Sequence, residues 1–254
     1  GDTDTTPYGG GTWASRGAGI GGEAVLKASR QLKNNILKIA AVIMQTKEND
    51  LDVRDDNVVR KDGGKGMSLK ELAQTVYYRG HELPPGTNPE LITTSSFLIE
   101  GIPFVFTNSA MGCLVDVDID TGLIKIEKFW AVEDCGTQIN PKLVEEQIKG
   151  GVVQGIGGAL YEENIYDEYG NLVNGNMADY LVPMAYEMPD IIVDHVVTNS
   201  GRSILGAKGA GEAGTGGAPA AIMNAVNDAL KVKNVEVKSQ PITPEKVLIA
   251  LGKI

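Results

Sequence analysis

The chain has 254 residues, two cysteines and a formal net charge of −10. The acidic balance and the lack of a dense Lys/Arg cluster argue against nucleic-acid binding, and no apolar run approaches the roughly 20 residues that span a bilayer. Two cysteines make no disulfide scaffold, so we expect a cytoplasmic protein. The opening GDTDTTPYGGGTW is no signal peptide, and a start at Gly1 without Met indicates a fragment or a processed product.

The first part of the chain predicts two helices between loops. Residues 1–22 form a glycine-rich loop, and apolar residues over 25–43 then recur at three- and four-residue spacing, as on one face of a helix. Ser68 and Glu71 form a capping-box pattern, so a second helix starts near Ser68. Prolines and glycines over 79–96 predict another loop.

A β-hairpin follows. LVDVDID (114–120) alternates apolar and acidic residues strictly, as a strand with one buried face does. Thr121 and Gly122 are suited to a turn, and LIKIEKFWAV (123–132) predicts the returning strand.

Asn140 and Pro141 predict a helix start, with Asn as the N-cap and Pro at the first helical position. This helix contains several glycines, each of which weakens it by roughly 1 kcal/mol relative to alanine. We therefore expect another element or a ligand to lie close to its backbone. The glycines are Gly150, Gly151, Gly155, Gly157 and Gly158.

Four further elements complete the prediction. NIYDEYGNLVNG (164–175) predicts a hairpin that turns near Tyr169 and Gly170, and residues 190–198 predict a strand. A short amphipathic helix follows Pro219, and Thr243 starts the last helix.

These strands and helices do not alternate as βαβ units. We therefore predict an α+β fold, a layered sandwich of mixed sheets and helices. We expect either one large domain over 1–254 or two lobes, about 1–100 and 101–254.

Two stretches match G-x-G-x-x-G, the dinucleotide-binding pattern: GAGIGG (17–22) and GAGEAG (209–214). A true fingerprint needs a buried strand directly before it, and neither match has one. Phosphate contact near residues 15–22 stays open, because backbone N–H groups lie at a helix start there and Ser15 and Arg16 add a hydroxyl and a charge. A plain glycine-rich helix cap is an equal alternative.

Other motifs carry less weight. Asp116, Asp118, Asp120 and Glu127 imitate a calcium loop, but Thr121 stands where the sharp-turn glycine belongs.

The remaining metal-ligating and nucleophilic residue types form no motif. His81 and His195 are isolated, and no zinc-hydrolase or serine-esterase motif is present. Cys113, at a strand start, is expected to be buried, Cys135 could be buried or reactive, and two cysteines cannot hold an iron–sulfur cluster.

One acid stands out. Glu212 lies within GAKGAGEAGTGGAP (206–219), where its neighbours are too small to screen it. A surface glutamate is one interpretation. The other is a partly desolvated carboxylate, held by glycine turns against a ligand, that acts as a base.

Five stretches in a fixed order cover nearly the whole chain: GDTDTTPYGGGTWASR, FTNSAMGCLVDVDIDTG, EDCGTQINPKLVEEQIKGGVVQGIGGALYEE, GAKGAGEAGTGGAP and PITPEKVL. Together they resemble the C-terminal half of the molybdenum-binding subunit of the xanthine dehydrogenase/aldehyde oxidase family, the molybdenum hydroxylases.

The resemblance implies a mechanism in which Glu212 is the general base that takes a proton from a Mo–OH group. An aldehyde carbon, or an aromatic carbon next to nitrogen, is then hydroxylated with oxygen from water. The resemblance implies a molybdopterin cofactor, usually the cytosine dinucleotide form in bacterial members. The residues that would contact it are Ser15, Arg16, Gly17, Ser109, Ala110, Gln154 and Gly211. Ser109 replaces a glycine of many members, so the pocket could differ in shape.

The upstream half of the family's subunit has no counterpart in this sequence. The implied partners are that half, on the same or a separate chain as in some nicotinate dehydrogenases, and subunits with iron–sulfur clusters and FAD. Two alternatives stay open: a non-catalytic structural half, and a module that binds an ordinary nucleotide at a subunit interface.

Overall fold

The computed structural model describes residues 2–4, 10–101 and 105–254. The chain divides into two compact units. The inserted unit is Ile20–Leu98, and the main unit combines Gly1–Gly19 with Ile99–Ile254. Residues 1 and 5–9 of the predicted N-terminal loop lie outside the described residues.

The inserted unit packs two helices against a small sheet. Helix α1 (Gly22–Ile43) and helix α2 (Leu69–Tyr78) confirm the two predicted helices. The antiparallel sheet, in the order β1-β2-β3, was not predicted, because β1 (Leu51–Arg54), β2 (Asn57–Arg60) and β3 (Met67–Ser68) are too short to show a period. Its core contains Ile39, Leu51, Val58 and Leu72.

Local capping fixes the start of α2. The Ser68 hydroxyl accepts a hydrogen bond from the backbone N–H of Glu71 at 3.1 Å, as the capping pattern predicted. After α2 the chain is irregular apart from one short helical turn at Gly80–Glu82, which confirms the predicted loop.

The main unit is built on a three-stranded mixed sheet in the order β4-β5-β6. Strands β4 (Asn108–Val117) and β5 (Ile124–Asp134) form the predicted antiparallel hairpin, although β4 begins six residues before Leu114. Strand β6 (Asp190–His195) pairs with β5 in parallel. A parallel pair requires a long crossover, and the chain between β5 and β6 supplies it.

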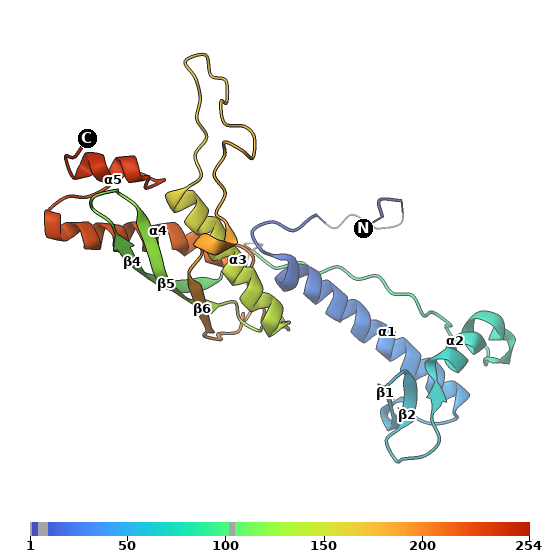
Figure 1. Cartoon of the computed structure of the whole chain (residues 1–254). Helices are drawn as coiled ribbons and strands as arrows, with labels where there is room; N and C mark the ends of the chain where they lie inside the picture. The colour runs from blue at the N-terminus through green and yellow to red at the C-terminus, as the bar shows by residue number, and fades with distance from the viewer. Residues whose placement is uncertain (1, 5–9, 102–104) are drawn as a thin grey trace. The chain divides into compact units, whose positions relative to one another are not determined.

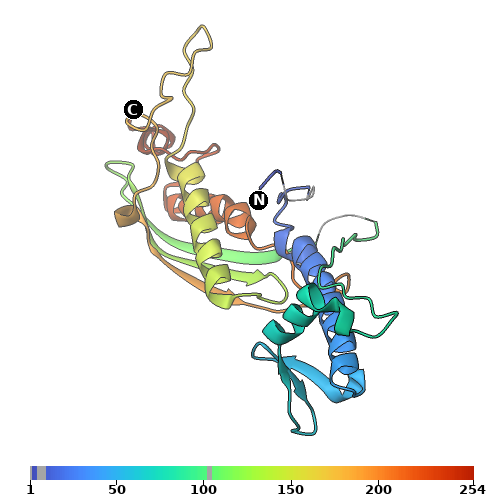
Figure 2. The ribbon, with the colours of Figure 1, turned by 90° about the vertical axis from the view of Figure 1, so that its right-hand side faces the viewer.

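Helices α3 (Pro141–Leu160) and α4 (Ala213–Leu230) lie on one face of this sheet (Figures 1 and 2). Asn140 caps α3 by accepting a hydrogen bond from the N–H of Leu143, as predicted. Helix α5 (Pro244–Ala250) is capped by Thr243 and confirms the last predicted helix. The core between sheet and helices contains Phe129, Ile148, Val152, Ile156, Ile222 and Val226. The α+β prediction is confirmed.

The glycines of α3 let α4 approach its backbone. A Cβ added at Gly151 would lie 3.1 Å from Cα of Gly214, and one added at Gly155 would lie 2.6 Å from Cβ of Ala218. The Thr215 hydroxyl also donates a hydrogen bond to the carbonyl of Gly151. The expected close approach is therefore made by another helix.

The prediction for α4 was wrong at its start, because α4 begins at Ala213 and includes Pro219. The glycines before Pro219 disfavour a helix locally. Packing against α3 outweighs that preference, since Gly214 lies directly against the backbone of Ile148 and Val152.

The predicted hairpin over 164–175 forms only in part. One antiparallel bridge joins Tyr166 to Leu172, next to a turn at Gly170. Residues 161–189, named here the arm, project from the end of α3 (Figures 1 and 2). None of the helices in the described part of the chain combines the length and apolar character needed to span a bilayer.

The glycine contact gives a first prediction. We expect Gly155→Ala to lower the free energy of unfolding by about 1–3 kcal/mol, because the new methyl group would overpack against α4. The matched control is Gly158→Ala in the same helix, where an added Cβ meets nothing within 4 Å. That change should raise stability by up to about 1 kcal/mol. Denaturant titration of both variants measures the difference, and equal effects would contradict the packing argument.

A buried acid gives a second prediction. Glu133, on β5, is fully buried and neither carboxylate oxygen has a hydrogen-bond partner among the described residues. Burial raises the pKa of Glu133 from its ordinary value of 4.5 to about 7. The folded chain therefore keeps this proton at pH values where the unfolded chain has lost it, and stability falls as pH rises from about 4.5 to about 7.

Glu133→Gln should remove this fall. The difference in unfolding free energy, variant minus wild type, should therefore increase by up to about 3 kcal/mol when the pH is raised from about 5 to about 8. Urea titrations at the two pH values test this, and a difference that does not change with pH would contradict it.

Candidate functional site

Glu212 is positioned by the start of α4, where it is the N-cap residue. Its side chain is exposed and lies at the end of the glycine-rich loop. A carboxylate at this place is favoured by the partial positive charge of a helix N-terminus.

Ser15 holds this carboxylate. The Ser15 hydroxyl donates a hydrogen bond to Oε2 of Glu212 and accepts one from its backbone N–H, both at 2.9 Å. Ala14 and Ser15 have φ values of 51° and 52°, a left-handed conformation that non-glycine residues adopt rarely. Such backbone persists where surrounding contacts fix it, often at functional sites. Oε1 of Glu212 has no hydrogen-bond partner among the described residues.

The glycines around Glu212 have different neighbours. A Cβ at Gly209 or Gly211 would come within 3.1 Å of Ser15, so these glycines make room for the serine. Gly214 lies against α3. A Cβ at Gly216 would meet nothing within 4 Å, so this glycine faces open space beside Glu212.

A cavity of about 450 Å³ lies in front of Glu212 and is formed by the main unit alone. It brings together three residues proposed from the sequence: Ser15, Ser109 and Glu212. The lining is Ala14, Ser15, Val105, Phe106, Thr107, Ser109, Gly209, Glu212, Ala213 and Gly216.

The other proposed contact residues do not line this cavity. The Arg16 guanidinium donates to the carbonyls of Gly10 and Gly11 and lies 3.9 Å over the ring of Trp13, so it is engaged within its own loop. Gly17 lies against the Thr12 side chain.

The remaining three lie near the cavity without lining it. Ala110 pairs with Val132 in the sheet. Gln154 accepts a hydrogen bond from Thr215, at 3.3 Å, and Gly211 accepts one from Gln147.

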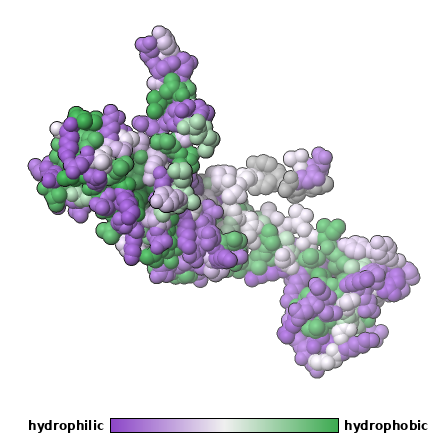
Figure 3. Space-filling view, in the orientation of Figure 1, coloured by the Kyte–Doolittle hydropathy of each residue, from purple (hydrophilic) through white to green (hydrophobic). Residues whose placement is uncertain are grey.

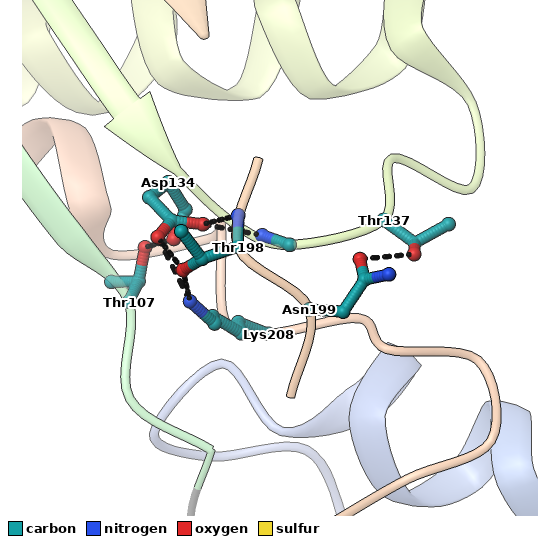
Figure 4. Close-up of polar contacts among 7 residues, drawn as sticks. Thr107, Asp134, Thr137, Thr198, Asn199 and Lys208 are labelled. Carbon is teal, nitrogen blue, oxygen red and sulfur yellow. Dashed lines mark hydrogen bonds and ion pairs between the residues drawn. The ribbon is translucent and has the colours of Figure 1, made fainter. Parts of the chain in front are cut away.

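A polar cluster anchors the loop that leads to Glu212 (Figure 4). Asp134, the last residue of β5, accepts hydrogen bonds from the Lys208 ammonium at 2.9 Å and from the Thr198 backbone N–H and hydroxyl. Lys208 also donates to the Thr198 hydroxyl, at 2.6 Å. These bonds connect the end of β5 and the segment after β6 to Lys208, which lies four residues before Glu212.

This ion pair is mostly removed from water, since the side chains of Lys208 and Asp134 are 9% and 12% exposed. Burial would raise the pKa of Asp134, but hydrogen bonds from Thr198 and Lys208 outweigh it and hold the pKa well below its usual range. Asp134 therefore carries its charge at neutral pH.

Sequence reasoning did not single out Asp134, Lys208 or Gln147. All three lie inside the stretches that carried the family resemblance. Two of them carry a weak signal in the sequence, since Asp134 is an acid just after a predicted strand and Lys208 is a lone lysine among glycines. Nothing in the local sequence showed that Asp134 and Lys208 are in contact.

The cysteines lack the surroundings of reactive thiols. Cys113 lies in the middle of β4, not at a strand start as expected; its thiol donates to the carbonyl of Ala221, and burial raises its pKa to about 11. Cys135 is buried, which raises its pKa as well.

Asp118 of the calcium-like pattern has a structural role. Asp118 accepts hydrogen bonds from the N–H groups of Asp120 and Thr121, and so caps the hairpin turn. Within residues 2–4, 10–101 and 105–254, no three His, Cys, Asp or Glu side chains are grouped as ligands for a metal ion.

Comparison with known proteins identifies the family. The family model of the molybdopterin cofactor-binding domain matches residues 1–189. The chain belongs to this family. The resemblance to the molybdenum hydroxylases is confirmed.

Individual relatives agree. The chain is 38% identical over 245 residues to the nicotine 6-hydroxylase large subunit of Paenarthrobacter nicotinovorans, covering 96% of the chain and 30% of that protein. It is 37% identical to the carbon monoxide dehydrogenase large chain of Afipia carboxidovorans, covering 92% of the chain and 28% of the relative.

A solved structure agrees as well. Quinoline 2-oxidoreductase from Pseudomonas putida 86 superposes with a TM-score of 0.86 at 35% identity, over 98% of this chain and 32% of that one. The chain thus spans about 30% of the length of the relatives that it matches.

The buried ion pair gives a third prediction. Lys208→Met leaves the Asp134 carboxylate buried without its cation, so we expect the free energy of unfolding to fall by about 3–5 kcal/mol. The control is Lys238→Met, whose ion pair with Glu236 is on the surface and whose loss should change stability by less than about 1 kcal/mol. Thermal or urea unfolding compares them. Similar small effects from both variants would show that the cluster does not anchor the loop.

Proposed function

We propose that this chain is the part of a molybdenum hydroxylase that supplies the general base, Glu212, and one wall of the cofactor site. One observation carries the proposal: the Glu212 carboxylate is held by Ser15 at the edge of a cavity, and Oε1 has no hydrogen-bond partner in the part of the chain that the structure describes, so it can accept a proton. A carboxylate fixed by its neighbours and directed to an open cavity meets the geometric requirement for a base.

The residues present fit the expected cofactor as one wall of its site. No side chain of the described residues covers Gly216, and the Ser109 side chain is exposed at the same cavity. These residues, with Ser15 and Gly211, would hold the cofactor. When bound, it would supply the two-electron oxidation.

The proposed task of Glu212 is to accept a proton at Oε1 from a hydroxyl group that derives from water. The hydrogen bond from the Ser15 hydroxyl to Oε2 fixes the rotamer of Glu212 and leaves Oε1 as the proton acceptor. Correct placement of a proton acceptor contributes about 10²–10⁴-fold to rate. In this scheme the anchored Lys208 segment keeps Glu212 in place.

The remaining features of the proposal follow family membership. The cofactor would be molybdopterin in its cytosine dinucleotide form, and iron–sulfur clusters and FAD would be carried by other subunits or domains. The large subunits of nicotine hydroxylase and carbon monoxide dehydrogenase support a multi-subunit assembly. The first partner would be the remaining part of the molybdenum subunit.

For the substrate we propose an aldehyde or an N-heteroaromatic compound that is hydroxylated at carbon. The names of two relatives, a nicotine hydroxylase and a quinoline oxidoreductase, support the heteroaromatic class. The mixed apolar and polar lining in front of Glu212, with Phe106 and Val105 beside Ser109, suits a flat ring with few polar atoms.

The fourth prediction tests Glu212 in the assembled enzyme. Glu212→Gln keeps the size of the side chain and removes the base, so turnover should fall by about 100-fold or more while molybdenum and pterin contents stay unchanged. Turnover is followed with quinoline, nicotine or an aldehyde and an artificial electron acceptor, and molybdenum by elemental analysis.

Two comparisons sharpen this test. Glu236→Gln, an exposed glutamate of the same unit, should leave both readouts unchanged. Unchanged turnover in Glu212→Gln would favour the alternative of a non-catalytic structural part, and release of an ordinary nucleotide instead of a pterin would favour a nucleotide module.

A further inference from the structure

The arm, residues 161–189, is unusual in what it exposes. Ten large hydrophobic side chains between Ile165 and Tyr186 are exposed, among them Tyr169 at 81%, Met177 at 77% and Tyr186 at 96%. Figure 3 shows green hydrophobic residues along the projecting arm, with purple residues at its tip. Contiguous exposed apolar surface of this kind usually marks an interaction site.

Most hydrogen bonds of the arm's polar groups are made within the arm, and Glu163 also forms an ion pair with Lys246 of α5, at 3.7 Å. Tyr180 donates to Glu162 at 2.8 Å, the Asn174 amide joins Ile165 to Glu163, and Asp167 accepts from the backbone of Tyr169 and Asn171. These bonds give the arm a defined conformation while its apolar side chains point outward. A loop that only faces water shows the opposite distribution.

The charge of the arm restricts its partner. It contains six acidic residues and no Lys, Arg or His. A second copy of the chain, with its formal net charge of −10, would bring like charges together, which costs free energy at an interface. The charge therefore favours an apolar surface framed by lysine and arginine.

The base of the arm continues into a larger hollow. A cavity of about 800 Å³ lies there. Its lining includes the apolar or aromatic residues Tyr161, Tyr186, Met188 and Ile124, the acids Glu127 and Asp190, and Lys125, which pairs with Glu127 at 2.7 Å. Apolar contact area and acidic charge thus extend from the arm onto the main unit.

We propose that the arm and this hollow are the docking surface for the remaining part of the molybdenum subunit, through an apolar, basic-framed face of that part. The inference rests on the proposed function. Its support is the length of chain outside this structure, since this chain covers only about 30% of its relatives, together with the charge and the outward apolar side chains of the arm.

The test places a photo-crosslinker at the arm tip. In the assembled enzyme, Tyr169 is replaced by p-benzoylphenylalanine and the captured peptides are identified by mass spectrometry. We expect capture of molybdenum-subunit sequence outside residues 1–254, on the same or a separate polypeptide. Capture of a second copy of residues 1–254, capture of an iron–sulfur or flavin subunit, or no capture would overturn the inference.

The matched control is Tyr78, a tyrosine of the inserted unit that is 83% exposed. With p-benzoylphenylalanine at position 78, we expect no capture of the peptide that is captured from position 169. If both positions captured the same peptide, the inference would be overturned. A second variant, Tyr169→Asp with Met177→Asp, should weaken association of the two parts at least tenfold, or open the interface to protease where they share one polypeptide. These readouts do not use turnover, so they separate failure of the docking surface from failure of Glu212 as the base.

Discussion

The buried ion pair between Asp134 and Lys208 is the contact on which the candidate site depends. It joins the end of β5 to the loop before Glu212, and Thr198, just after β6, takes part in the same cluster. Removing either charged side chain would leave the other buried without its partner, which costs several kcal/mol. The sheet, otherwise held by apolar packing, therefore holds the loop that leads to Glu212.

A second contact completes the placement of the acid. Glu212 is restrained from the sheet through Lys208 and from the N-terminal segment through the hydroxyl of Ser15. Functional groups restrained from two sides keep a productive geometry better than groups on a free loop. The glycines serve this arrangement, because Gly209 and Gly211 allow Ser15 to reach the carboxylate.

Features set by neighbouring residues could be predicted from the sequence, and features set by distant packing could not. The caps at Ser68 and Asn140 and the β4–β5 hairpin follow from short patterns and were confirmed. The start of α4 was wrong because the close contact of Gly214 with α3 is invisible locally. Glu212 stood out by its small neighbours, whereas its contact with Ser15 and its cavity required the folded chain.

The inserted unit has a consequence for how the protein forms. Because Ile20–Leu98 stands between the two parts of the main unit, the contact between Ser15 and Glu212 closes a loop of 197 residues. Long-range contacts of this kind form slowly, since chain entropy must be overcome before they are gained. The acid and its hydroxyl partner can therefore meet only after residue 212 has left the ribosome. During synthesis, Ser15 would remain without this contact until more than three quarters of the chain has been made.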